Sequence, residues 1–154
     1  MPETAGTAVL GLDYGTKKVG VALLHEQLGV ARPLAVVPVA DSDLLWRELD
    51  TLVAAWRPRR LVVGLPLAAT GGETPMARAA RRFATALKAR YPLAVELHDE
   101  RLTTREAAGT LAAARRAGLL TRSAARRRDA AAAAAMLDSW QHEARCRVVF
   151  RENP

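Results

Sequence analysis

Acidic side chains follow two apolar runs, at positions where carboxylates can do chemistry. Asp13 comes directly after the run Ala8–Leu12, and Asp99 and Glu100 follow the run Leu93–Leu97. Open α/β sheets place their sites beyond the carboxyl ends of the strands. Mg²⁺ and Mn²⁺ take oxygen ligands, and two such ions about 3.5–4 Å apart can activate water and stabilise the leaving oxygen of a phosphodiester. These acids favour metal-dependent phosphodiester hydrolysis, although Asp is also common in turns.

A third acid, Asp129, lies on the apolar stripe of a predicted helix. The stripe continues through Ala133, Met136 and Trp140, at spacings of four, three and four residues, which places all four side chains on one helix face. An unpaired carboxylate there would either cost free energy or have its pKa raised. A bound metal ion would relieve that cost, and so would an arginine partner from Arg126–Arg128. Both interpretations stay open.

The sequence pattern alone does not show whether Asp99 or Glu100 is the metal ligand. Alternate side chains of a strand share a face. Asp99 therefore belongs with Leu93, Val95 and Leu97, and Glu100 belongs to the opposite face.

The chain is basic, and almost all of its positive charge is arginine. It has 23 Lys and Arg residues against 16 Asp and Glu residues, a formal net charge of +7. This balance favours a nucleic-acid partner, although a solvated, arginine-rich surface would give the same composition. Between Arg101 and Arg128 there are eight arginines and one acid. The residues expected to contact phosphate are Lys17, Lys18, Arg101, Arg105, Arg127 and Arg128.

The composition bounds the class of protein. The 154 residues suit one domain, expected to span 1–154, and half of them are hydrophobic, which argues against disorder. Cys146 is the only cysteine, so no internal disulfide and no thiolate cluster can form. The sequence shows no signal-peptide pattern and no apolar run of about 18 residues. We therefore expect a cytoplasmic protein that does not cross a membrane.

Five apolar segments predict strands, and four segments with helical spacing or capping signals predict helices. A strand meander followed by crossovers gives an α/β domain with a mixed sheet and helices on its faces. In chain order, the predicted elements are the strands Ala8–Leu12, Val19–Leu24 and Leu34–Val39, the helix Asp43–Trp56, the strand Arg60–Leu65, a helix from Thr74 to about Arg90, the strand Leu93–Leu97, a helix from Thr103 to Gly118, and a helix from Ser123 to about Glu143. The tail Arg147–Phe150 is either a short strand or coil.

Four motifs cover nearly the whole chain in order. They are GLDYGTKKVGVA at Gly11–Ala22, VGLPL at Val63–Leu67, DERLTTREA at Asp99–Ala107 and RRDAAAAAAML at Arg127–Leu137. Together they resemble the YqgF/RuvX family of Holliday-junction-resolvase-like proteins, also described as pre-16S rRNA nucleases. The resemblance implies a ribonuclease H-like fold with a mixed five-stranded sheet, and catalytic, metal-binding roles for Asp13, Glu100 and Asp129. The segment Ala68–Gly72 departs from the family pattern because it lacks Asn and Asp.

The resemblance also implies a function. It predicts an endonuclease that uses Mg²⁺ or Mn²⁺, in a two-metal site, on either branched DNA or precursor 16S rRNA. A junction resolvase makes two symmetric cuts and should be a homodimer. His98 is close enough in the sequence to the acids to assist a water. Two other classes of protein are alternatives: a non-catalytic nucleic-acid-binding module, and an actin-like ATPase fragment, which would need a second lobe.

Overall fold

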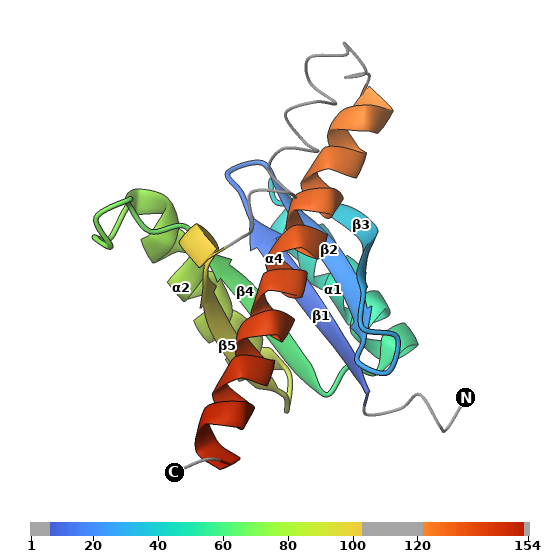
Figure 1. Cartoon of the computed structure of the whole chain (residues 1–154). Coiled ribbons are helices and arrows are strands. Elements are labelled where there is room, and N and C mark those ends of the chain that lie inside the picture. Colours follow the sequence, from blue (N-terminus) through green and yellow to red (C-terminus); the bar gives the residue numbers. More distant parts are fainter. Residues whose placement is uncertain (1–6, 103–121, 153–154) are drawn as a thin grey trace.

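The computed structural model describes residues 7–102 and 122–152, and its strands form one mixed sheet (Figure 1). The elements are β1 (Ala8–Tyr14), β2 (Lys18–His25), β3 (Ala31–Pro38), α1 (Ser42–Trp56), β4 (Arg60–Leu65), α2 (Pro75–Arg90), β5 (Ala94–Asp99), a 3₁₀ turn (Glu100–Leu102) and α4 (Arg122–Glu152). The strand order is β3-β2-β1-β4-β5. β1, β2 and β3 form an antiparallel meander, and β4 and β5 run parallel to β1. The predicted mixed five-stranded sheet is confirmed.

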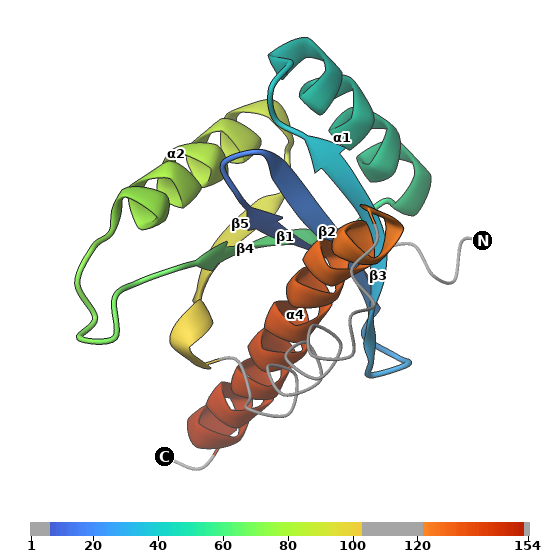
Figure 2. The same ribbon diagram turned by 90° about the horizontal axis from the view of Figure 1, so that it is seen from above.

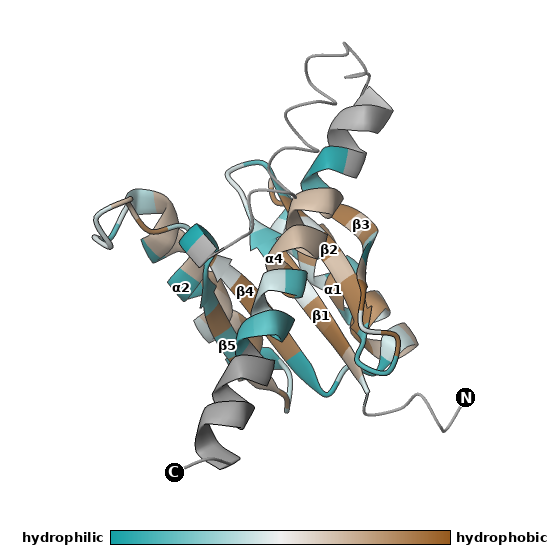
Figure 3. Cartoon of the chain, viewed as in Figure 1, coloured by the Kyte–Doolittle hydropathy of each residue, from teal (hydrophilic) through white to brown (hydrophobic). Residues whose placement is uncertain are grey.

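Helices cover both faces of the sheet: α1 and α2 lie on one side and α4 crosses the other (Figure 2). The two faces of β1 supply the two layers, because alternate side chains point to opposite faces. Leu10 and Leu12 belong to the core under α1 and α2, and Val9 belongs to the core under α4, where it joins Met136 and Leu137. Hydrophobic residues accordingly follow the strands behind α4 (Figure 3). The three central strands, β1, β2 and β4, are therefore buried on both faces, as their apolar runs predict, whereas β3 and β5 at the edges are partly exposed.

A capping side chain precedes each of the two helices on the first face. Thr74 caps α2 by accepting a hydrogen bond from the Ala77 amide at 3.0 Å, and Pro75 is the first helical residue. Asp41 caps α1 through the amides of Asp43 and Leu44. These side-chain acceptors satisfy amides that have no partner within the helix. The prediction of α2, from its Thr74 cap to Arg90, is confirmed.

Some boundaries differ from prediction. β1 continues through Asp13 and Tyr14, because both residues still pair with β2. The last helix does not end near Glu143. It continues to Glu152, so the tail Arg147–Phe150 is helical and the prediction of strand or coil was wrong.

The helix predicted from Thr103 to Gly118 lies outside the described residues. Within 7–102 and 122–152, no helix combines the length and the hydropathy needed to cross a membrane.

Candidate active site

Asp13 and Glu100 come from neighbouring ends of parallel strands. Asp13 is the penultimate residue of β1, and Glu100 begins the 3₁₀ turn directly after β5. β1, β4 and β5 are parallel, so their carboxyl ends lie at the same edge of the sheet. The two acids therefore reach that edge from strands separated only by β4.

Gly64 of β4 gives Glu100 the space to cross toward Asp13. A Cβ atom added at Gly64 would lie 2.3 Å from Glu100 Oε1, so the Glu100 side chain lies directly over this glycine. Val62, two residues earlier on the same face, packs in the core under α4. Glu100 thus lies on the α4 face, and its carboxyl group hydrogen-bonds Asp13.

Gly20 of β2 likewise leaves space, in this case for the backbone of α4. A Cβ atom added there would lie 2.2 Å from the backbone oxygen of Asp129 and 2.7 Å from its carbonyl carbon. The α4 backbone therefore rests on the β2 backbone at this position. Gly20 pairs with Asp13 in the sheet register, so this contact brings Asp129 next to Asp13. The stripe expected for α4 is confirmed, since Ala133, Met136 and Trp140 are buried beyond it.

The neighbouring carboxyl groups perturb one another. Burial raises the pKa of Asp13, the Glu100 hydrogen bond opposes this, and the Asp129 charge adds to the rise. Burial, the charge of Asp13 and the hydrogen bond to it raise the pKa of Glu100 to about 8. Because that hydrogen bond favours ionised Asp13 and neutral Glu100, Glu100 holds the proton and donates to Asp13 at neutral pH. Such a pair is typical of carboxylates that share a functional site.

Asp129 has a lysine as its ion-pair partner. Lys18 Nζ lies 2.9 Å from Asp129 Oδ2, and both side chains are about one-third exposed, at 36% and 27%. The Oδ2 atom itself is buried, and no donor among the described residues gives it a hydrogen bond of acceptable geometry. The Lys18 ammonium therefore balances the charge of Asp129 and is the contact of this oxygen.

Asp99 and Glu100 have different surroundings. Arg101 holds Asp99 by a bidentate pair, with Nη2 at 2.6 Å from Oδ2 and Nε at 3.0 Å from Oδ1. These hydrogen bonds lower the pKa of Asp99. Asp99 is thus fixed as a carboxylate by its own neighbour, whereas Glu100 turns to Asp13.

The predicted phosphate contacts fall into three groups. Lys17 is exposed in the β1–β2 turn, and Arg128 is half-buried on α4. Lys18 and Arg101 are already engaged with Asp129 and Asp99. Arg105 and the side chain of Arg127 lie outside what the structure describes.

His98 is not placed to assist a water. It is 3% exposed, and its Nε2 atom lies 3.0 Å from Ser139 Oγ of α4. It belongs to the contact between β5 and α4, which does not favour the role expected from its place in the sequence.

The three acids present the kind of donor atom that a divalent metal ion binds. Among the described residues, no group of three or more His, Cys, Asp or Glu side chains is placed so that it could hold a metal ion. Three carboxyl groups nevertheless converge from β1, the 3₁₀ turn and α4, and carboxylate oxygen is the ligand that Mg²⁺ and Mn²⁺ prefer. The proton held by Glu100 and the charge that Asp129 carries beside Asp13 are what a divalent cation would relieve.

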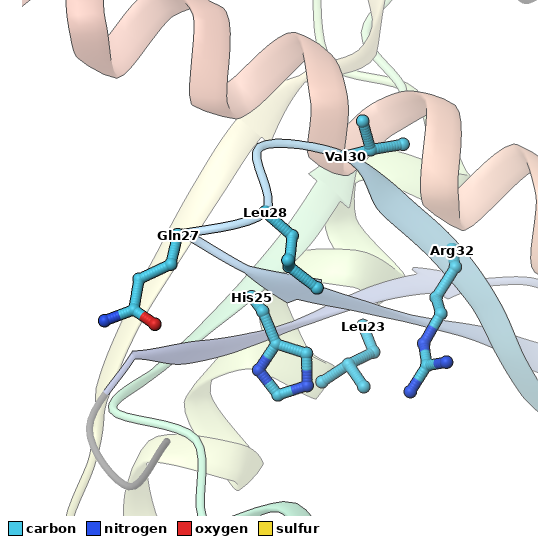
Figure 4. Close-up of a pocket in the computed structure, with 6 residues that line it drawn as sticks. All are labelled: Leu23, His25, Gln27, Leu28, Val30 and Arg32. Carbon is cyan, nitrogen blue, oxygen red and sulfur yellow. The ribbon is translucent and has the colours of Figure 1, made fainter. Parts of the chain in front are cut away.

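Figure 4 shows a separate cavity beside the turn between β2 and β3. In the strand register this turn follows His25, which pairs with Ala8 at the start of β1, whereas Asp13 lies near the end of β1. The volume of the cavity is about 330 Å³, and Leu28 and Val30 on its rim are 75% and 67% exposed. The lining residues are Leu23, His25, Gln27, Leu28, Val30 and Arg32. None of the three acids contributes to it.

The sequence interpretation missed the two glycines that assemble the site. Gly20 and Gly64 lie inside strands, where glycine is disfavoured unless another backbone or group approaches closely. That placement was the available signal. It could not indicate which group approaches, because Asp129 and Glu100 are distant in the sequence.

The strand order, the helices on both faces and the acids at the edge of the sheet define a ribonuclease H-like protein. The chain belongs to the RuvX family, described as Holliday junction resolvase, whose match covers residues 7–143. Among its relatives, a protein of Marinobacter nauticus is 41% identical over 113 residues, which are 73% of this chain and 79% of the relative. A protein of Pectobacterium carotovorum is 43% identical over 103 residues, which are 67% and 74% of the two chains. Both are named "Putative pre-16S rRNA nuclease".

The fold is also similar to that of a solved structure, Thermus thermophilus RuvC in complex with a Holliday junction substrate. The TM-score is 0.58, and the match covers 91% of this chain and 96% of the RuvC chain. At 19% sequence identity, this likeness shows the shared fold alone.

Proposed function

We propose that this chain is a divalent-metal-dependent endonuclease whose active site consists of Asp13, Glu100 and Asp129. The observation that supports this most is the hydrogen-bonded pair of Asp13 and Glu100 beneath α4, with Asp129 brought alongside by the contact at Gly20. Family membership supports the same reaction class. A module that only bound nucleic acid would gain nothing from carboxylates beside the bound phosphate, which repel it unless a cation intervenes.

The three acids would hold Mg²⁺ or Mn²⁺, in a two-metal site. The chemistry that such ions supply is activation of the attacking water and stabilisation of the leaving oxygen. Asp13 lies between the other two acids, since Glu100 hydrogen-bonds it and Asp129 perturbs its pKa. It is therefore the acid we expect to tolerate substitution least. Glu100 must release its proton before its carboxylate can bind a cation.

The proposed substrate is structured nucleic acid, with precursor 16S rRNA favoured. The relatives with 41% and 43% identity are named "Putative pre-16S rRNA nuclease". Branched DNA is the second candidate, because the family is described as Holliday junction resolvase. Lys17, which is exposed beside the site, and Arg128 on α4 are the described residues that we assign to phosphate contacts. Precursor rRNA would place the protein in the cytoplasm, and the junction substrate would require a homodimer.

The test is cleavage of two labelled substrates, a four-way DNA junction and a structured precursor rRNA fragment, with Mg²⁺ or Mn²⁺. The control is Asp13→Asn. Metal-dependent cuts in RNA alone, absent in the variant, would support rRNA processing, and paired symmetric nicks in the junction would support resolution. Tight binding without cleavage of either substrate would contradict the proposal and favour a non-catalytic binding module.

A further inference from the structure

Lys18 is placed by the same strand that positions Asp129. It is the first residue of β2 and lies two residues before Gly20, so it shares the sheet face on which α4 rests. α4 contacts β2 at Gly20 through the backbone of Asp129, and the Asp129 side chain then meets Lys18 Nζ at 2.9 Å. The ion pair is thus a direct consequence of how the helix docks on the sheet.

The other nearby cations are not equivalent to Lys18. Arg101 is held by Asp99 through a bidentate pair, and Lys17 is exposed in the turn. Among the described residues, Lys18 is the cation that forms an ion pair with one of the three acids, Asp129. An ammonium group at 2.9 Å from Asp129 Oδ2 occupies the space that a divalent ion bound to this oxygen would need. It would also repel that ion.

We propose that Lys18 is a built-in counter-ion of Asp129 that competes with the divalent metal and must leave this carboxylate before the metal binds. The inference rests on the proposed function, because it assigns Asp129 to the metal. Lys18 keeps Asp129 compensated in the metal-free protein, where its charge would otherwise face Asp13. Once displaced, the ammonium group lies at the edge of the site and can contact a phosphate of the substrate. Lys18 is therefore a positioning residue that couples metal binding to substrate binding.

The first test compares Mn²⁺ affinity, measured by electron paramagnetic resonance without nucleic acid, in the wild type, Lys18→Gln and Lys17→Gln. Both variants lose one positive charge, but only Lys18 contacts Asp129. We expect Lys18→Gln to bind Mn²⁺ roughly two- to fivefold more tightly, as the loss of a partly exposed ion pair implies, and Lys17→Gln to match the wild type. Equal or weaker binding by Lys18→Gln, or an equal gain in Lys17→Gln, would overturn the inference.

A second test uses the wild-type protein and does not depend on the folding of a variant. The chain has three lysines, Lys17, Lys18 and Lys88, so their side-chain ¹⁵Nζ signals are readily distinguished. On Mg²⁺ titration we expect the Lys18 signal to change with the midpoint of metal binding and the Lys88 signal to stay constant. Metal binding that leaves Lys18 unchanged would refute the inference but not the proposed function. No metal binding at all would refute both.

Discussion

Gly20→Ala should damage both stability and activity, because this position has no space for a side chain. The added Cβ would lie 2.2 Å from the backbone oxygen of Asp129, so α4 must retreat by about 1 Å to restore ordinary contact. Overpacking of this kind costs about 1–3 kcal/mol of unfolding free energy, which is roughly 3–10 °C in Tm for a chain of this size. The same shift moves Asp129 away from Asp13. A misplacement of about 1 Å in an active site can lower activity about 100-fold.

Thermal unfolding followed by circular dichroism, together with Mn²⁺-dependent cleavage, would measure both effects. The matched control is Gly72→Ala, whose Cβ would meet, among the described residues, only Thr70 Oγ1 at 3.7 Å. We expect its unfolding free energy to stay within about 0.5 kcal/mol of the wild type. A Gly20→Ala protein with the stability and activity of the wild type would show that α4 does not rest on β2 in this way.

Three further predictions concern Gly64, Glu100 and Asp50. Gly64→Ala should reduce cleavage with little change in stability, because its Cβ would meet the flexible end of Glu100, at 2.3 Å; a loss of stability as large as that of Gly20→Ala would contradict this. The unfolding free energy of the wild type should fall as pH rises from about 4.5 to about 8. In this range Glu100 keeps its proton in the folded protein, where its pKa is about 8, but has lost it in the unfolded chain. Glu100→Gln should flatten that slope in urea unfolding, and an unchanged slope would refute the assignment. Hydrogen bonds from Arg90 are the main cause that lowers the pKa of Asp50 to about 2. Asp50 should therefore stabilise the fold above pH 4, and this stabilisation should be lost as pH falls through about 2. Asp50→Asn should therefore show less acid destabilisation than the wild type over that range.

Most of the fold could be predicted because local signals agreed with the tertiary structure. Thr74 and Pro75 fix the start of α2 by chemistry that needs no tertiary contact. The predicted boundaries were wrong where strand pairing or helix propagation extends an element beyond its local sequence signal. Asp13 stays in β1 because it pairs with Gly20. Residues 147–150 join α4, since extending an existing helix adds a hydrogen bond for each residue fixed.

The candidate site was only partly predictable for a related reason. Alternation placed Glu100 on the face opposite Asp99 but could not show which face looks toward Asp13. That depends on Gly64 of the intervening strand, which leaves the Glu100 side chain room to cross. The helical stripe identified Asp129 as an acid on a buried face, but its partner, Lys18, lies more than a hundred residues away in the sequence. Such contacts are set by the docking of α4, which no local pattern encodes.

The assignment of Glu100 rather than Asp99 to the metal is the most direct test of the proposed active site. The measurement is Mn²⁺-dependent cleavage of the precursor rRNA fragment and the four-way junction by the wild type, Glu100→Gln and Asp99→Asn. These variants make the same chemical change at adjacent positions. We predict that Glu100→Gln abolishes cleavage, because it removes a carboxylate beside Asp13, and that Asp99→Asn retains it, because the Asp99 carboxylate is bound to Arg101. Cleavage that survives in Glu100→Gln, or is lost in Asp99→Asn alone, would contradict the proposed site.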